Sequence, residues 1–190
     1  TEVRLGAPQS VELEAERALG WFFTHFIGDN GCWVHRIDHQ GKCVDLSVDL
    51  YDQAFVLFGC AAAARAFPAK ADRLELVARD LLASLSVHHR AARGGFHEAE
   101  AHSKPLRANP HMHLLEAFLA WEEVSDDPLW RDASDSVINL ARTVFVDLTS
   151  GVLREFFDAQ WNPYPGDLGR QIEPGHHFEW AWLLQRWGVS

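Results

Sequence analysis

The stretch from Val48 to Phe67, VDLYDQAFVLFGCAAAARAF, decides the fold of this protein. Its apolar residues lie almost all the way round a helix, so the sequence predicts a helix that is buried on two sides. Pro68 ends it, because proline cannot continue the backbone hydrogen bonds of a helix. The segment from Pro110 to Val124 has the same character. We therefore expect at least two helices that are buried on two sides, which we call enclosed helices.

Helices with a single apolar face alternate with these enclosed helices. The segments 10–26, 71–88 and 128–146 are amphipathic, whereas 48–67, 110–124 and the Trp-rich segment 174–187 are apolar on most faces. A short extended piece follows Gly31, Gly95 and Gly151, at intervals of 64 and 56 residues. The same order of elements thus occurs three times, and a repeat of about 60 residues is typical of solenoids and closed arrays.

This order predicts an all-α protein, an α/α toroid of about six helices with short strands in β-hairpins. We expect one domain over residues 1–190, built from three helix-pair repeats at roughly 10–66, 70–124 and 128–187. The strands are expected near 32–36, 95–98 and 152–156. Three unrelated helical hairpins in a bundle are the alternative, and the spacing alone leaves that alternative open.

The composition excludes several classes of partner. Seventeen basic residues face 27 acidic ones, a formal charge of −10. We therefore expect no nucleic-acid partner and no binding to an anionic membrane surface. No apolar run approaches the roughly 20 residues that span a bilayer. With three cysteines and no signal peptide at the N-terminus, the sequence predicts a soluble, cytoplasmic protein.

The segment Glu173–Trp180, EPGHHFEW, holds the strongest candidate for catalysis. Pro174 suits the first turn of a helix, which places His176 in that turn. Glu179 and Trp180 follow at i+3 and i+4, on nearly the same face. The helix dipole favours a neutral imidazole that acts as a base, and Glu179 would fix its tautomer. A surface cap made by the same residues is the plainer interpretation.

Two further segments place polar side chains at the start of enclosed helices. Asn109 and His113 lie at the start of the second such helix, and Tyr51 lies at the start of the first. In a toroid these helix ends open on the same mouth as His176. Helix N-termini attract anions, so an anionic intermediate is favoured there. A core histidine that bonds to a neighbour is the alternative for His113.

A zinc site is the competing interpretation of the early cysteines and histidines. Cys32, His35, His39 and Cys43 resemble a ligand set. However, Cys32 and His35 would lie on opposite faces of a strand, and the spacing matches no common zinc motif. We therefore expect no metal site.

Three motifs together resemble signatures of the N-acylglucosamine 2-epimerase superfamily, which also holds mannose and sulfoquinovose isomerases and cellobiose 2-epimerases. They are DLYDQAF at 49–55, NPHMHLLEA at 109–117 and EPGHHFEW at 173–180. The likeness runs from about residue 10 to the C-terminus. It implies an (α/α)6 barrel and proton transfer between C1 and C2 of an open-chain sugar through a cis-enediol(ate).

The resemblance also implies roles for named residues. Two histidines act as general base and acid in that family, without a metal or other cofactor. His176 matches one of them, with Glu179 as its helper. His113, Asn109 and Tyr51 match positions that contact the substrate or assist ring opening. The expected substrate is a monosaccharide, converted by aldose–ketose isomerisation, as between mannose and fructose, or by 2-epimerisation of N-acylglucosamine.

The family barrel has twelve helices, about twice the number expected here. The chain is therefore either a fragment or a half-sized protein, and the second catalytic histidine would lie beyond Ser190. Enclosed helices need cover, so we expect missing chain segments or a second copy to close the half barrel, and weak turnover by the chain alone. A non-catalytic sugar-binding module and a helical-repeat interaction scaffold are the alternative functions.

Overall fold

The computed structural model describes residues 9–98 and 105–189, so the N-terminal stretch used for the expectation about targeting lies outside it. Six α-helices are present in these ranges, as predicted. They are α1 Gln9–His25, α2 Leu50–Ala66, α3 Ala71–His88, α4 Ala108–Glu122, α5 Pro128–Leu140 and α6 Pro174–Gly188. A π-helical turn at Ala141–Phe145 continues α5, and short 3₁₀ turns lie at Pro68–Lys70 and Leu168–Arg170.

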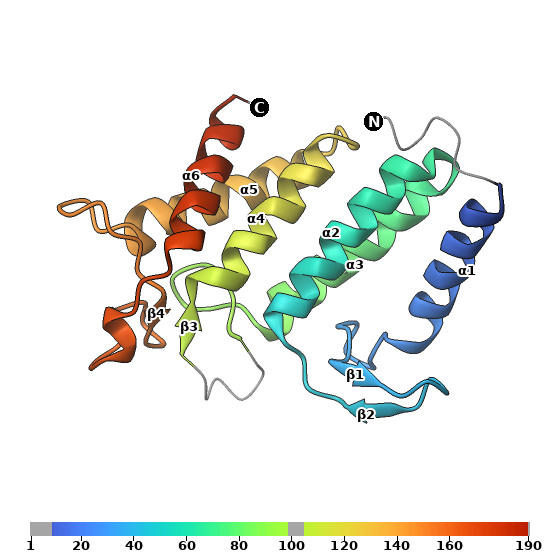
Figure 1. Ribbon diagram of the computed structural model, residues 1–190, viewed down its shortest axis with the longest axis horizontal. Coiled ribbons are helices and arrows are strands. Elements are labelled where there is room, and N and C mark those ends of the chain that lie inside the picture. The colour runs from blue at the N-terminus through green and yellow to red at the C-terminus, as the bar shows by residue number, and fades with distance from the viewer. Residues whose placement is uncertain (1–8, 99–104, 190) are drawn as a thin grey trace.

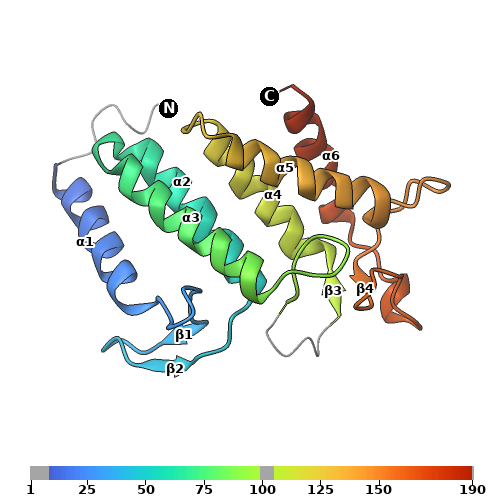
Figure 2. The same ribbon diagram turned by 180° about the vertical axis from the view of Figure 1, so that it is seen from behind.

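The six helices form two layers. Figure 1 shows α2, α4 and α6 in front, and Figure 2, from behind, shows α3 and α5 covering them. Outer α3 packs on inner α2, and outer α5 packs on inner α4. The three inner helices all begin on the side where the hairpins lie (Figure 1). This is the arc of alternating inner and outer helices that the sequence predicts.

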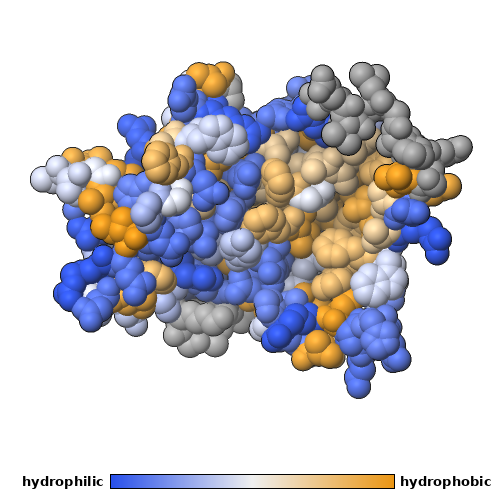
Figure 3. Space-filling model, in the orientation of Figure 1, coloured by the Kyte–Doolittle hydropathy of each residue, from blue (hydrophilic) through white to orange (hydrophobic). Residues whose placement is uncertain are grey.

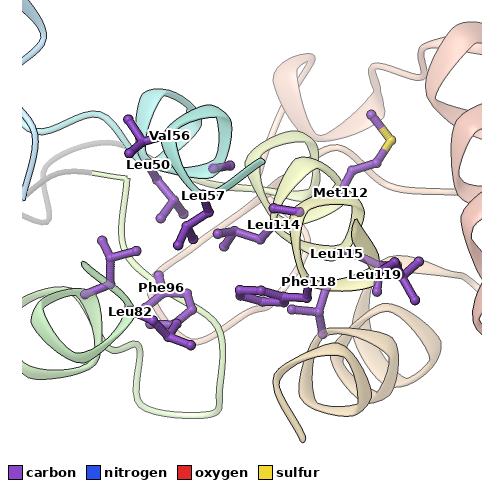
Figure 4. Packing of buried hydrophobic residues seen from close by; sticks show 14 of the residues in the cluster. Leu50, Val56, Leu57, Leu82, Phe96, Met112, Leu114, Leu115, Phe118 and Leu119 are labelled. Atoms are coloured by element: carbon purple, nitrogen blue, oxygen red, sulfur yellow. The ribbon is translucent and has the colours of Figure 1, made fainter. Parts of the chain in front are cut away.

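The core lies between the two layers. Leu57 of α2 and Leu114, Leu115 and Phe118 of α4 are at most 1% exposed, and they meet Leu82 of α3 (Figure 4). Side chains of this size each contribute roughly 1.5–3 kcal/mol when fully buried. Among the described residues, α2 and α4 bury nine and ten residues, whereas α6 buries only Trp180 and Leu183. The expected burial is therefore found for the segments 48–67 and 110–124, and the helix at 174–187 is largely exposed.

The strands are shorter than predicted and partly displaced. Antiparallel β1 Arg36–Ile37 pairs with β2 Cys43–Asp45, and β3 Leu106–Arg107 pairs with β4 Phe156–Phe157. The segments expected as strands form single bridges instead, because each follows a tight turn and then diverges toward the next inner helix. The bridges join Ile27 to Trp33, Arg90 to Phe96 and Val146 to Leu153.

The three hairpins share one pattern of backbone hydrogen bonds. In the first, Val34 N donates to Phe26 O, and in the second, His97 N donates to His89 O. In the third, Arg154 N donates to Phe145 O. Each outer helix therefore passes into its hairpin in the same way.

Gly95 is required by the second hairpin for two reasons. Its φ is +68°, a conformation that favours glycine, and a Cβ there would lie 2.6 Å from the Nε2 atom of His111. Any side chain at this position would push against the start of α4. The glycine that marks this repeat in the sequence is thus a requirement of packing.

The two edges of the arc expose apolar surface. A groove of about 300 Å³ between α1 and α2 is lined by aromatic rings, and Figure 3 shows an apolar area over it. At the other edge, Phe178 of α6 is 79% exposed. Within the described residues, no helix combines the length and the apolar character that crossing a membrane requires.

Candidate functional site

The candidate site lies where the three inner helices begin. Asp49 caps α2 by accepting a hydrogen bond from Tyr51 N at 2.9 Å, and Pro174 occupies the first turn of α6. The unpaired N–H groups of a helix start carry partial positive charge, so three such starts on one side favour anions there. We call this region the mouth, defined by the first two turns of α2, α4 and α6.

Each inner helix is tied to its hairpin by one side chain in its first turns. His111 Nε2 accepts from Phe96 N at 2.9 Å, and His111 Nδ1 donates to the carbonyl four residues earlier, at 2.8 Å. His177 makes the same two bonds, from Leu153 N at 3.0 Å and to Glu173 O at 3.3 Å. Both imidazoles are therefore neutral and carry their proton on Nδ1.

Gln53 makes the equivalent hydrogen bonds in the first unit. Its Oε1 accepts from Trp33 N at 2.9 Å, and its Nε2 donates to Trp33 O and Asp49 O. Gln53, His111 and His177 therefore occupy equivalent positions, which we call the tie positions. Burial lowers the pKa of His111 to about 4, so this ring stays neutral and structural.

The tie positions align the residues beside them. The residue immediately before each tie position is, in order, Asp52, Pro110 and His176. On each hairpin, the residue two positions after the one that bonds to the tie is, in order, His35, Glu98 and Glu155. In the first and third units these two positions are in contact, as His35–Asp52 and Glu155–His176.

The third pair joins His176 to Glu155. His176 Nδ1 lies 3.0 Å from Glu155 Oε2, and the Glu155 side chain is only 2% exposed. His176 Nε2 lies 3.5 Å from an oxygen of Glu173, a residue whose side chain is 57% exposed. Nε2 therefore lies on the solvent side, and Glu155 holds the ring from within. This arrangement can accept a proton at Nε2.

The second pair is replaced by an ion pair to a different residue. Pro110 has no side-chain donor, and Glu98 instead accepts from Arg107 at N, Nε (3.0 Å) and Nη2 (2.5 Å). Burial raises the pKa of Glu98 to about 7, although Arg107 acts to lower it. This carboxylate is 1% exposed, and its role is structural.

The first pair has the two residue types exchanged. His35, on the hairpin, lies with Nδ1 2.5 Å from an oxygen of Asp52, on α2. Both side chains are about one-third exposed. An imidazole–carboxylate pair therefore occurs twice at equivalent places, with the histidine on the hairpin in one case and on the helix in the other.

Tyr51 and His113, which are both expected at helix starts on the same mouth, are in contact. Their ring centroids are 4.9 Å apart and nearly perpendicular, and Phe55 packs on the same imidazole. His113 Nδ1 lies 3.3 Å from Glu116 Oε2. This cluster connects the mouth to a cavity on the inner face of the arc.

The cavity measures about 420 Å³ and is bounded by all three inner helices. Glu123 of α4 bridges Arg65 of α2, at 2.8 Å, and Arg186 of α6, at 2.5 Å, along its wall. Trp182 adds an aromatic ring that is 53% exposed. Aromatic and charged groups of this kind suit a polar ligand with apolar faces.

Two expected site residues are placed differently from the prediction. Glu179 is exposed, and among the described residues the carboxylates in contact with His176 belong to Glu155 and Glu173. Trp180 is 2% exposed and packs against Phe145, so its ring faces the core. The i+3 and i+4 positions lie beside His176 on the helix surface, but its imidazole turns toward the hairpin.

Asn109 lies in the first turn of α4 and is half-buried. Its Oδ1 atom is buried and has no hydrogen-bond partner among the described residues. A free buried acceptor costs about 1–3 kcal/mol unless a ligand or water satisfies it. The atom is therefore suited to a hydroxyl donor.

Glu155 and Trp182 are missing from the candidates that the sequence suggests. The signal for Glu155 is alternation: Leu153, Glu155 and Phe157 are buried, and the residues between them are half-buried. A carboxylate in the inward register of an extended piece needs a partner. The signal for Trp182 is weaker, because a Trp-rich helix does not reveal which ring faces inward.

The suspected zinc ligands are not brought together. Cys32 is buried, and His35 is paired with Asp52. Over residues 9–98 and 105–189, no three His, Cys, Asp or Glu side chains gather into a group that could hold a metal ion.

Curated relatives connect this geometry to sugar enzymes. The chain is 43% identical over 177 residues to mannose-6-phosphate isomerase of Rhizobium meliloti (strain 1021), an alignment of 91% of this chain and 45% of that protein. It is 32% identical over 105 residues to D-mannose isomerase of Pseudomonas cannabina pv. alisalensis, covering 50% of this chain and 25% of that protein. The chain spans less than half the length of these relatives.

Solved structures share the fold. The chain is similar to cellobiose 2-epimerase from Spirochaeta thermophila DSM 6192, with a TM-score of 0.81 and 24% identity over 98% of this chain and 49% of that chain. A sugar epimerase from a ruminal bacterium gives a TM-score of 0.83 and 21% identity, over 97% and 50%. These likenesses confirm the predicted half of an (α/α)6 barrel. The sequence model of N-acylglucosamine 2-epimerase (GlcNAc 2-epimerase) matches residues 3–190, and the chain belongs to that family.

Proposed function

We propose that the chain supplies one acid/base group, and part of the binding surface, of a sugar isomerase or 2-epimerase. The observation that carries the proposal is the pair at the mouth, in which Glu155 holds His176 Nδ1 at 3.0 Å and leaves Nε2 on the solvent side. The names of the curated relatives favour mannose or a mannose phosphate as the aldose, and aldose–ketose isomerisation as the reaction.

In the proposed reaction, Nε2 of His176 takes the proton from C2 of the open-chain aldose. The C2–H electron pair forms the C1=C2 bond, and the carbonyl oxygen at C1 gains the negative charge of a cis-enediolate. The three helix starts at the mouth favour that charge. To form the ketose, O1 gains a proton, O2–H loses its proton as C2=O forms, and a proton returns to C1. Return of the proton to C2 from the other face restores the C1 carbonyl and gives the epimer.

The binding groups follow from the same geometry. We propose that Tyr51 and His113, which touch each other, contact sugar hydroxyls or assist ring opening, and that Asn109 Oδ1 accepts from a hydroxyl. We also propose that Glu179 assists His176 through its exposed carboxylate. Trp180 is expected from its place beside His176 to bind the substrate, but its ring is buried, so we propose Trp182, which lines the cavity, as the aromatic contact.

Solvent deuterium exchange tests the proposal. Incubation of the purified chain with mannose in D2O, followed by mass spectrometry, is expected to show slow incorporation at C2. His176→Ala should abolish it, and His177→Ala serves as the matched control on the same turn. Binding of mannose by calorimetry without exchange would favour a sugar-binding module, and neither binding nor exchange would favour an interaction scaffold.

Completion of the half barrel is part of the proposal. The groove between α1 and α2 and the exposed face of α6 lie at the two open edges of the arc. Leaving such faces in water costs several kcal/mol at roughly 25 cal/mol per Å². We infer that further chain or a second copy covers them. Light scattering that shows a monomer, together with no binding of a hydrophobic dye, would overturn this inference.

A further inference from the structure

We propose that Glu155 is a positioning residue for His176. Its carboxylate accepts the hydrogen bond from Nδ1–H and so fixes the tautomer in which Nε2 has no proton. When Nε2 takes a proton, the same carboxylate stabilises the imidazolium that forms. The second statement rests on the proposed function, whereas the first concerns geometry alone.

The burial of Glu155 is the first support. The side chain is 2% exposed, in the inward register of the hairpin between Leu153 and Phe157. Taking a carboxylate out of water costs several kcal/mol, so a group kept in such a place needs a compensating partner. The described side chain that bonds to it is His176, which lies 21 residues further along the chain.

The incomplete pairing of this carboxylate is the second support. The Oε1 atom of Glu155 is buried and has no hydrogen-bond partner within the described ranges. By contrast, Glu98, at the equivalent place, receives three bonds from Arg107. A purely structural carboxylate is expected to be satisfied as Glu98 is. Glu155 makes its contact with His176, an imidazole in the first turn of α6 at the mouth.

The charges around Glu155 support the same assignment. Burial raises the pKa of Glu155, and the bond to His176 acts against that rise. Glu173 also acts to raise this pKa. The hydrogen bond to His176 is therefore the largest influence that favours the ionised form of the carboxylate.

The tautomer of His176 is decided by which nitrogen finds an acceptor. Nδ1 lies 3.0 Å from the buried Glu155, whereas Nε2 lies 3.5 Å from the exposed Glu173. A shorter bond in a drier place is stronger, so the proton belongs on Nδ1. A carboxylate behind a histidine acts in this way in hydrolytic triads, where its loss leaves the wrong tautomer.

Nuclear magnetic resonance of the ring nitrogens tests the first statement. In the wild-type chain at neutral pH, the ¹⁵N shifts of His176 are expected to show a predominant Nδ1–H tautomer. A predominant Nε2–H tautomer would overturn the proposal without any variant. Glu155→Gln keeps the size of the side chain but can donate as well as accept, so it should give a mixture of tautomers or the reverse one.

The first unit supplies a matched control. Asp52→Asn removes the carboxylate from the equivalent imidazole pair, so it should change the ring signals of His35 and leave those of His176 unchanged. Circular dichroism checks that both variants fold. A folded Glu155→Gln variant in which His176 keeps its wild-type tautomer would overturn the proposal.

Deuterium exchange at C2 of mannose separates the two statements. Glu155→Gln is expected to lower the exchange rate by about 10²-fold at saturating sugar, within the range for a misplaced general base, with little change in KM. Wild-type tautomer signals as expected, together with no exchange by the wild-type chain, would leave the positioning intact and count against the proposed function. A variant with altered tautomer but a wild-type exchange rate would overturn the second statement.

Discussion

The second and third hairpins bury a carboxylate at the same place and use it differently. Glu98 meets Arg107, a permanent cation, and the adjoining helix position is Pro110. Glu155 meets His176, whose imidazole can carry a proton on either ring nitrogen. In the second unit the buried carboxylate forms an ion pair within the fold, and in the third it contacts an imidazole at the mouth.

This difference shows that the repeat supplies a common structural frame. The chemical properties of each unit depend on the residue at one position within that frame. The tie residue holds each helix start in register with its hairpin, whether it is Gln53, His111 or His177. In the first and third units, the residue just before the tie also contacts a hairpin side chain, His35 or Glu155. Only where this residue can exchange a proton does the frame become a candidate for catalysis.

The largest expected effect separates the two neighbouring histidines of α6. In an enzyme with measurable turnover, His176→Ala should lower the rate by roughly 10²–10⁴-fold, because a general base is lost. His177→Ala should instead lower stability, since it leaves Leu153 N without its acceptor. Steady-state kinetics and urea unfolding of both variants measure this. A greater loss of rate in His177→Ala than in His176→Ala would contradict the assignment.

The next effect concerns the tie of the second unit. His111→Ala should cost about 3 kcal/mol of unfolding free energy, because it leaves Phe96 N without its acceptor and opens a cavity in the core. His111→Gln should lose less, since Gln53 makes the same two kinds of bond in the first unit. Denaturant titration gives both values, and equal losses would show that the tie positions are not interchangeable.

The smallest effect is the dependence of stability on pH at Glu98. Its pKa is about 7 in the folded chain and about 4.5 in the unfolded one, so the folded state binds the proton more tightly. The contribution of this group to the free energy of unfolding is fully present below pH 4.5 and is lost as the pH rises toward 7. Glu98→Gln should remove about 2 kcal/mol of the decline between pH 5 and 8.

Thermal or denaturant unfolding at the two pH values measures that slope. Three carboxyl groups with lowered pKa values titrate below this pH range and do not contribute to the slope within it; they belong to Asp45, Asp147 and Asp158. The comparison is therefore between the wild-type slope and the Glu98→Gln slope in the same buffer. Parallel slopes would mean that Arg107 keeps Glu98 ionised throughout.

The helices are predictable from sequence because their hydrophobic pattern is strong. The segment 48–67 is expected to be an enclosed helix, and α2 spans Leu50–Ala66. The end of the third outer helix is harder to predict. A single helix over 128–146 is expected, whereas α5 ends at Leu140 and a π turn follows. A change from i→i+4 to i→i+5 bonding leaves no clear mark on the apolar pattern.

The site is predictable where it depends on position along a helix. That Tyr51 and His113 lie together follows from placing both at helix starts on one side of an arc. The partner of His176 is not predictable from helix spacing, because Glu155 comes from a hairpin and meets the ring only after the tie forms. Sequence neighbours such as Glu179 share the helix surface but not the direction in which the ring points.

The third hairpin has a consequence for how this repeat tolerates changes in length. Phe145 and Arg154 are bonded across one residue more than His89 and His97 are in the second hairpin. The added residue lies in the hairpin loop, between the bridged residues Val146 and Leu153, and the tie at His177 keeps its geometry. Insertions of a residue or two within a hairpin loop should thus be accommodated inside a single unit, which makes these loops suitable places for varying length in evolution and engineering.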